Sequence, residues 1–205
     1  PRKSDIMEYF GARYGSVPIV YVVQPQPAGL CDSVFCAGPA VEHGEGVMIG
    51  LPDTVWFPEG ALAELPGDAL SFLLFPVQRP ELFDAVVLEG DEVREIQVKQ
   101  ARPGSHWIWG AFKMPEQVFN ELLRLWHKRE RQDEYFGTLV NAYLAEGGRA
   151  VGVRAGEAYV DVGTLHGYRE AMRLLSTSRD AAVQKERAIP GYGRNLYQHR
   201  EPGRA

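Results

Sequence analysis

The sequence lacks the features that would direct it to a membrane or to nucleic acid. Its 205 residues contain no apolar run long enough to cross a bilayer and no signal-peptide pattern at the start. Acidic residues outnumber basic ones, 27 to 22, so a general affinity for nucleic acid or an anionic membrane is not indicated. These absences predict a cytoplasmic protein whose partners are small molecules or other subunits. A homo-oligomer is one possibility under this prediction.

Cysteine and histidine are too few, and too poorly spaced, for a metal or redox motif. Cys31 and Cys36 do not form Cys-x-x-Cys, and the five histidines show no ligand spacing such as His-x-x-x-His. A zinc site is therefore not expected, and the two cysteines are interpreted as buried free thiols. A complete Gly-rich phosphate loop is also missing, because 44-GEGVMIG-50 and 191-GYGRNL-196 match the P-loop and dinucleotide patterns incompletely.

What the chain does have is enough apolar material for a sizeable core. Hydrophobic residues make up 45% and aromatic residues 11%, which rules out disorder of the whole and suits one domain with a small appendage. The apolar content falls after Ser176. We therefore expect a domain over residues 1–176 and a polar, mobile tail over 177–205.

The first half of the chain reads as a strand, loop, helix and strand. Segment 17–23 is β-branched and aromatic, segment 30–41 has apolar residues at helical spacing, and 47–51 is a short apolar run. This order is typical of the βαβ unit of a parallel sheet, with 47–51 as a fully covered strand. The fold class predicted is α/β: a Rossmann-like, mixed but mostly parallel sheet flanked by helices.

Later segments continue the alternation of strands and helices. A short helix is expected within 58–68, a buried strand at 70–77, a hairpin from 84–90 and 92–100, a strand at 106–114, helices at 115–128 and 133–146, strands at 149–156 and 157–163, and a helix at 164–175.

Two carboxylates stand where predicted strands end. Asp53 and Asp161 each follow apolar residues and precede a turn. Ligands of open α/β sheets bind at the carboxyl ends of the strands, where two acids together would suit Mg²⁺. Since Mg²⁺ takes its other ligands from phosphate oxygens and water, the pair predicts a phosphorylated substrate. The alternative for each acid alone is a turn or helix-cap role.

Other candidates carry weaker signals. Gln24 could bond the edge of a planar base and Gly29 could let a ligand approach the backbone, although 24–29 also reads as an ordinary proline-stiffened loop. Lys99 could meet a phosphate, although a solvent-facing lysine in a strand is commoner. Gly110, inside a predicted strand, marks either a close approach or a β-bulge.

Taken in order, these segments resemble the sugar-phosphate nucleotidylyltransferases, especially the glucose-1-phosphate thymidylyltransferase type. The stretch 21-YVVQPQPAGLCDSVFCA-37 is similar to the family's Gln-x-x-Pro-x-Gly-Leu-Ala-Asp-Ala strand, loop and helix, and 49-IGLPDTVWF-57 is similar to its Gly-Asp-Asn strand end. Two shorter pieces, 97-QVKQ-100 and 107-WIWGAF-112, follow. Finally, 158-AYVDVGTLHGYREA-171 is similar to Trp-x-Asp-x-Gly-Thr with its helix.

The resemblance, which covers roughly residues 5 to 175, implies a nucleotidyltransferase domain. Such a domain joins a sugar 1-phosphate to a nucleoside triphosphate, dTTP or UTP, by in-line attack on the α-phosphorus and releases pyrophosphate. By matched position the implied site residues are the Mg²⁺ ligands Asp53 and Asp161, the nucleotide contacts Gln24, Gly29 and Leu30, and the sugar-phosphate and sugar contacts Lys99 and Gly110. Asp53, Asp161 and Lys99 would carry the catalysis.

The chain also departs from the family pattern. The family's first strand, with its Gly-x-Gly-Thr-Arg-Leu loop, would precede Pro1, so this N-terminally truncated chain is expected to catalyse little alone. Val98-Lys99 replaces a Glu-Lys pair, and Phe83-Asp84 replaces a Tyr-Gly. One alternative is therefore a non-catalytic nucleotide-sugar-binding or regulatory homologue. Another is a glycosyltransferase, which would ordinarily show an Asp-x-Asp that 51-LPDTVW-56 lacks.

Overall fold

The computed structural model describes residues 4–41 and 46–188, with side chains described as far as residue 176. The chain divides into two compact units, Pro1–Tyr159 and Val160–Ala205. Among the described helices, none is both long and apolar enough to span a membrane.

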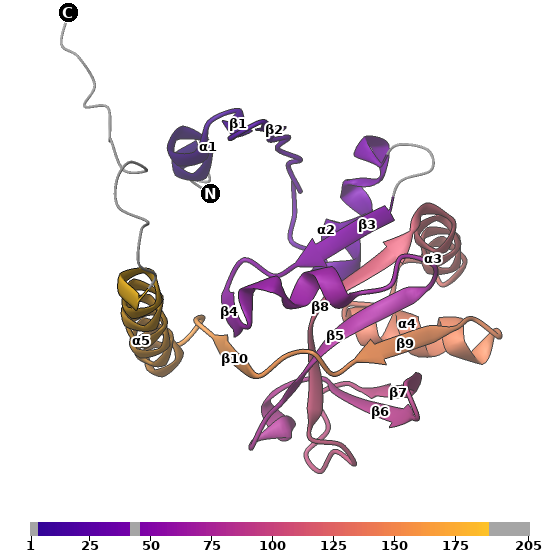
Figure 1. Ribbon diagram of the computed structural model, residues 1–205. Helices are drawn as coiled ribbons and strands as arrows, with labels where there is room; N and C mark the ends of the chain where they lie inside the picture. Colours follow the sequence, from indigo (N-terminus) through magenta and orange to yellow (C-terminus); the bar gives the residue numbers. More distant parts are fainter. Residues whose placement is uncertain (1–3, 42–45, 189–205) are drawn as a thin grey trace, which may run out of the picture. The chain divides into compact units, whose positions relative to one another are not determined.

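A six-stranded sheet forms the centre of the first unit (Figure 1). Its strands, in spatial order, are β3 (Gly46–Gly50), β8 (Trp107–Pro115), β5 (Leu70–Pro76), β9 (Ala150–Val153), β7 (Glu92–Gln97) and β6 (Ala85–Glu89). β6 also pairs with β8, through Ala85 and Ile108. The strands β8, β5, β9, β7 and β6 therefore form a closed ring of pairings.

The sheet is mostly antiparallel, so the prediction of mostly parallel, Rossmann-like strands is wrong. Within the six-stranded sheet, β5 with β9 is the parallel pair and the other described pairs are antiparallel. The connections account for one pair of each kind: β6 and β7 are joined by a tight turn at Gly90, whereas β5 reaches β9 by a long route that includes two helices. Short connections produce antiparallel pairs and parallel pairs need long crossovers. The coarser prediction of a mixed sheet with flanking helices is confirmed.

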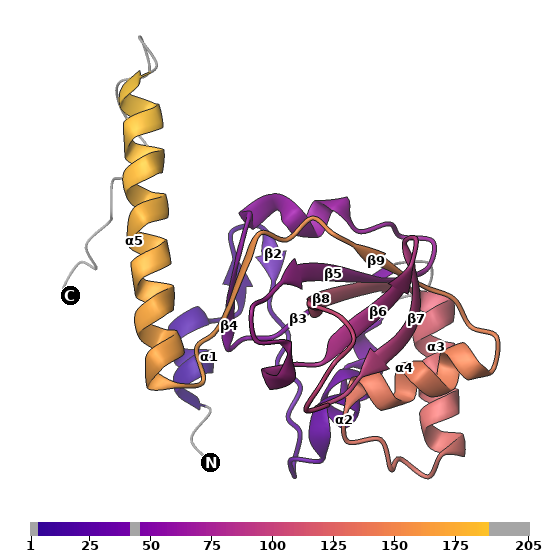
Figure 2. The same ribbon diagram turned by 90° about the horizontal axis from the view of Figure 1, so that it is seen from below.

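Helices cover one face of this sheet (Figure 2). They are α2 (Gly29–Cys36), α3 (Glu116–Lys128) and α4 (Phe136–Ala145), and they enclose the larger core with alternate residues of β5 and β8. Phe112 and Phe136 stack at 4.3 Å between ring centroids within it. The other face holds a smaller core, in which Leu73 and Phe75 pack against the 3-10 helix η2 (Glu59–Glu64). Two apolar layers explain why β5 is buried along almost its whole length, as predicted.

Segment 17–23 does not form the predicted strand. It contributes only β2 (Val17–Pro18), paired with β1 (Arg13–Tyr14) after the short helix α1 (Ser4–Phe10). In the described part of the chain no strand lies beside residues 19–23. Because β-branched residues form a strand only where the backbone finds a partner, propensity alone overestimated this element.

The predicted buried strand at 47–51 is an edge strand. β3 pairs with β8 antiparallel, and its residues alternate between exposed and partly buried. A five-residue apolar run has the same sequence signature in either position, and its direction depends on a partner some 60 residues away. With neither strand as predicted, the βαβ unit proposed for this region is wrong, although its helix is confirmed as α2.

The remaining elements follow the sequence more closely. In the first unit β4 (Thr54–Phe57) and the 3-10 turns η1 (Gly38–Ala40) and η3 (Pro80–Leu82) connect the larger elements. β10 (Ala158–Asp161) runs across the boundary into the second unit, where α5 (Leu165–Ala188) extends beyond the predicted helix at 164–175. The last part of the predicted tail, 189–205, lies outside the described residues.

Candidate functional site

The loop before α2 is held by its own glutamine. The Gln24 side-chain amide donates from Nε2 to Asp32 Oδ2 at 2.5 Å and accepts at Oε1 from Ser33 Oγ at 2.9 Å. Both partners lie in α2, so the helix fixes the orientation of the amide. These two bonds use one of its two donor hydrogens and one of the lone pairs on its oxygen.

Gly29 lies against the backbone that precedes α4. Its φ of +88° belongs to the left-handed side, and a Cβ at this position would lie 2.5 Å from the carbonyl oxygen of Glu134. The Leu30 N–H donates to the same oxygen at 3.2 Å, and the Leu30 side chain packs against the larger core. The glycine is therefore required by the chain's own packing, with or without a nucleotide.

Asp53 is an exposed acid in the turn between β3 and β4. The Thr54 hydroxyl donates to the carbonyl oxygen of Leu51 at 2.9 Å and closes that turn. The carboxylate thus projects from a turn fixed by other groups, and exposed carboxylate oxygens are donors that Mg²⁺ takes in proteins.

Asp161 lies in the second unit, at the end of β10, and is also exposed. Its Oδ1 accepts a hydrogen bond from the Gly163 N–H at 2.7 Å, while Thr164 Oγ1 accepts from the Gly167 N–H at 3.0 Å at the start of α5. This geometry is the turn role that the sequence left open as an alternative. Within the described residues no group of three or more His, Cys, Asp or Glu side chains gathers as a metal cluster.

Lys99 follows β7 in a turn, with φ +48°, and is not inside the strand as expected. Its Nζ lies 3.7 Å from Asp84 Oδ1, and its backbone N–H donates to the same oxygen at 3.3 Å. The Asp84 side chain is only 10% exposed, and this burial raises its pKa while Lys99 opposes the rise. The two departures from the family pattern, at 83–84 and 98–99, are therefore neighbours in space.

Gly110 is the unpaired residue of a β-bulge. In the pairing of β5 with β8, Leu73 faces Ala111 and Leu74 faces Trp109, so position 110 is passed over. A Cβ there would lie 2.5 Å from the Tyr159 ring and 2.6 Å from that of Phe75. Aromatic rings thus cover the glycine that the resemblance assigns to sugar binding. Of the two interpretations of Gly110 from the sequence, the β-bulge is the one that fits its geometry.

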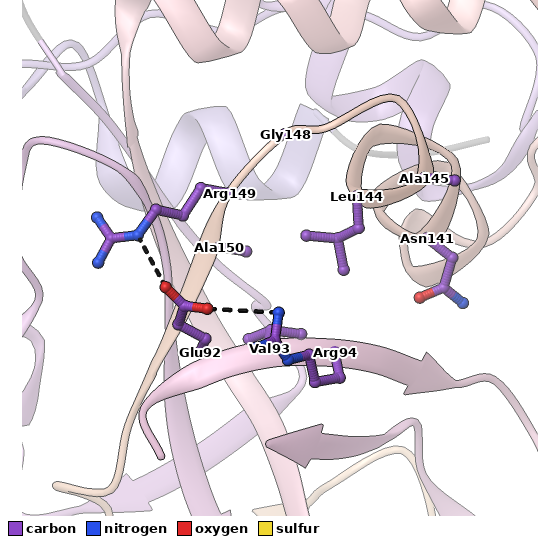
Figure 3. A pocket seen from close by; sticks show the side chains of 9 residues that line it. All are labelled: Glu92, Val93, Arg94, Asn141, Leu144, Ala145, Gly148, Arg149 and Ala150. Atoms are coloured by element: carbon purple, nitrogen blue, oxygen red, sulfur yellow. Dashed lines mark ion pairs between the residues drawn. The ribbon is translucent and has the colours of Figure 1, made fainter. Parts of the chain in front are cut away.

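Two open clefts lie elsewhere, on the surface near α3, α4 and β7. The first, of about 450 Å³, is lined by Glu92, Arg94, Asn141 and Arg149 among others (Figure 3). Glu92 pairs there with Arg149 at 3.5 Å and with Arg94 at 3.4 Å. The second, of about 470 Å³, shares Gly148 and Arg149 with it. None of the predicted site residues is among the described residues that line these two clefts.

Comparisons with known proteins bear on the fold. No protein-family model matches the chain, and no curated protein does. Among solved structures, a similar chain comes from the crystal structure of "a Putative Glucose-1-Phosphate Thymidylyltransferase from Bacillus anthracis in Complex with a Sucrose". The TM-score is 0.69 at 20% sequence identity, over 84% of this chain and 71% of that chain. At this identity the likeness shows a shared fold.

Proposed function

We propose that this chain is a sugar-1-phosphate nucleotidylyltransferase, or the larger part of one, that joins a sugar 1-phosphate to dTTP or UTP and releases pyrophosphate. The observation that carries the proposal is the shared fold with the Bacillus anthracis protein at a TM-score of 0.69. The order of sequence motifs points to the same type of enzyme without reference to any structure. The motif order is needed beside the fold, because a fold alone does not imply an activity.

The proposed roles follow the matched positions. Asp53 and Asp161 would be the Mg²⁺ ligands, and the bound ion would neutralise charge on the phosphates during in-line attack. Lys99 would bind the sugar phosphate. To do so, its half-exposed ammonium group must leave the Asp84 carboxylate, which lies 3.7 Å away. A phosphate, with more charge than one carboxylate, competes well for such a lysine.

Gln24 is suited to bind a nucleobase, and Gly29 and Leu30 would be the other nucleotide contacts. Its amide is already oriented by Asp32 and Ser33, and it retains a donor hydrogen and a lone pair beyond those two bonds. A preoriented side chain loses less conformational entropy on binding than a free one.

Two observations favour a second candidate, a nucleotide-sugar-binding homologue without turnover. Tyr159 and Phe75 cover Gly110, the proposed sugar contact. Asp84, which the family pattern does not contain, neutralises Lys99. Both changes would weaken the sugar-phosphate half of the site and leave the loop at Gln24 intact.

The test is pyrophosphate release by the full-length natural protein with Mg²⁺, dTTP or UTP, and a panel of sugar 1-phosphates. We expect turnover with at least one pair, and a loss of roughly 100-fold or more in kcat for Asp53→Ala and for Asp161→Ala. Asp68→Ala, at an exposed acid outside the proposed site, is the matched control. No turnover with any pair, combined with calorimetric binding of a nucleotide sugar, would favour the binding homologue; full activity in both Asp variants would exclude the proposed metal ligands.

A further inference from the structure

The Gln24 side-chain amide is held in one of its two possible orientations. An amide that turns by half a revolution about its last side-chain bond exchanges its oxygen and nitrogen and keeps the same shape. Asp32 Oδ2 lies 2.5 Å from Gln24 Nε2. The reversed amide would place an oxygen against this carboxylate oxygen, and both groups only accept hydrogen bonds. Asp32 therefore favours the orientation in which the amide nitrogen faces α2.

Ser33, the second partner of the amide, is compatible with either orientation. Its single hydroxyl hydrogen is within reach of two acceptors, Gln24 Oε1 at 2.9 Å and the Gly29 carbonyl oxygen at 3.2 Å. Against a reversed amide, the hydroxyl would donate to Gly29 and accept from the Gln24 nitrogen, since a hydroxyl both donates and accepts. Asp32 is therefore the partner that decides how the amide is oriented.

The orientation of this amide matters because pyrimidine bases differ in the order of donor and acceptor along one edge. Uracil and thymine present the O4 acceptor beside an N3–H donor, whereas cytosine presents an N4 amino donor beside the N3 acceptor. Because uracil and cytosine have nearly the same shape, an amide that is free to turn can pair with either. A fixed amide presents one order only, and a base with the opposite order leaves polar groups of the site unpaired.

We propose that Asp32 is a specificity-determining residue: by fixing the Gln24 amide, it makes the site select uracil or thymine and reject cytosine. This inference rests on the proposed function, which places the base against Gln24. The second N–H of Gln24 would donate to O4, and its oxygen would accept from N3–H with the lone pair that Ser33 leaves. The Gln24 side chain is partly exposed and so accessible to a base. Asp32 acts through Gln24 and need not touch the nucleotide.

The experiment is calorimetric titration of the full-length natural protein with UTP and with CTP. Mg²⁺ is present and sugar 1-phosphate is left out, so that binding alone is measured. We expect UTP to bind more tightly than CTP by roughly 10- to 100-fold, the discrimination that one bidentate contact to a base edge provides. Asp32→Asn should bring the two affinities within about threefold of each other, chiefly by tightening CTP, because asparagine donates as well as accepts and permits both amide orientations. Asp32→Ser should relax the preference in the same way through its hydroxyl.

Two control variants separate this effect from charge and from the other bond to the amide. Asp68→Asn removes a carboxylate at an exposed position outside the proposed site. Ser33→Ala removes the partner that is compatible with either orientation. Both variants should keep the preference for UTP. Since UTP and CTP carry the same triphosphate charge, any general change in affinity on loss of a carboxylate cancels in the ratio.

The outcomes distinguish this inference from the proposed function. A wild-type protein that binds UTP and CTP equally would overturn the role of Asp32 and leave the nucleotide site in place. So would Asp32 variants that retain the wild-type preference. A protein that binds neither nucleotide would refute the nucleotide site at Gln24 itself, and the inference with it.

Discussion

Gly29 and Glu134 approach each other so closely that the smallest side chain on residue 29 would lie 2.5 Å from the Glu134 carbonyl oxygen. The Leu30 N–H bonds to that oxygen as well. The loop that we propose for the nucleobase is therefore anchored on the connection between α3 and α4, which carries Glu134. A rigid anchor of this kind fixes where Gln24 presents its amide.

Gly29→Ala should lower the free energy of unfolding by about 3 kcal/mol, from left-handed backbone strain together with the contact on a backbone oxygen that cannot move aside. Gly90→Ala is the control, because Gly90 also has a positive φ but nothing within 4 Å of a Cβ. It should cost about 1 kcal/mol, the backbone term alone. Urea unfolding of both variants measures the difference. Equal losses of unfolding free energy would show that the backbone at Glu134 shifts to make room for the added methyl group.

The same connection contains an ion pair whose carboxylate is buried and whose arginine is partly exposed. Arg129 donates from Nε and Nη2 to the two oxygens of Asp133, at 2.8 and 2.9 Å, and the Asp133 side chain is only 2% exposed. Arg129→Gln should lower the unfolding free energy by about 2 kcal/mol, because it leaves a buried carboxylate short of donors. Arg94→Gln removes exposed pairs with Glu89 and Glu92 and should cost less than about 0.5 kcal/mol. If both variants unfold at the same urea concentration, the bidentate pair does not hold this connection.

Much of the layered core could be read from the sequence, because local pattern decides it. The continuous apolar run at 70–77 predicted a strand covered on both faces, and β5 is one. Gly90 and Asp91 between two strand-like runs specify a hairpin, which β6 and β7 form. The helical spacing in 115–128 and 133–146 similarly predicted α3 and α4.

The errors arise where a partner far along the chain decides the outcome. The pairing of β3 with β8 depends on residues beyond 106, and the exposure of 19–23 depends on a partner strand that propensity cannot supply. In the candidate site, the contact between Asp84 and Lys99 spans 15 positions and depends on the hairpin register. The sequence marked both residues as departures from a family pattern, but it could not show that they meet.

The two cysteines should differ sharply in reactivity. Cys31 is fully buried, and burial, with the nearby Asp133 charge, raises its pKa to about 12; Cys36 is only partly buried. Since the thiolate is the nucleophile, a disulfide reagent at pH 8 should modify Cys36 readily and leave Cys31 unmodified until the protein unfolds. Cys36→Ser should remove the fast reaction in the native protein, and both thiols of the wild type should react in urea. Two equally fast thiols in the native state would contradict the packing of α2.

Asp84 should make stability depend on pH in the direction opposite to that of most carboxylates. Burial raises its pKa above the ordinary value of 3.8, so between that value and the raised pKa the folded protein binds more protons than the unfolded chain. Stability from this group is therefore greatest in acid and falls as the pH rises through that window.

Asp84→Asn isolates this contribution, since asparagine keeps an oxygen acceptor for the Lys99 N–H and does not titrate. Unfolding free energies of wild type and variant, measured by urea denaturation from about pH 4 to 7, should diverge with rising pH in favour of the variant. Asp68→Asn, at an exposed acid, should show no such divergence. A difference that runs the other way would mean that Lys99 outweighs burial at Asp84. In that case the ion pair between Lys99 and Asp84 is strong enough to compete with a sugar phosphate for the lysine. The nucleotide-sugar-binding homologue without turnover would then be the better proposal.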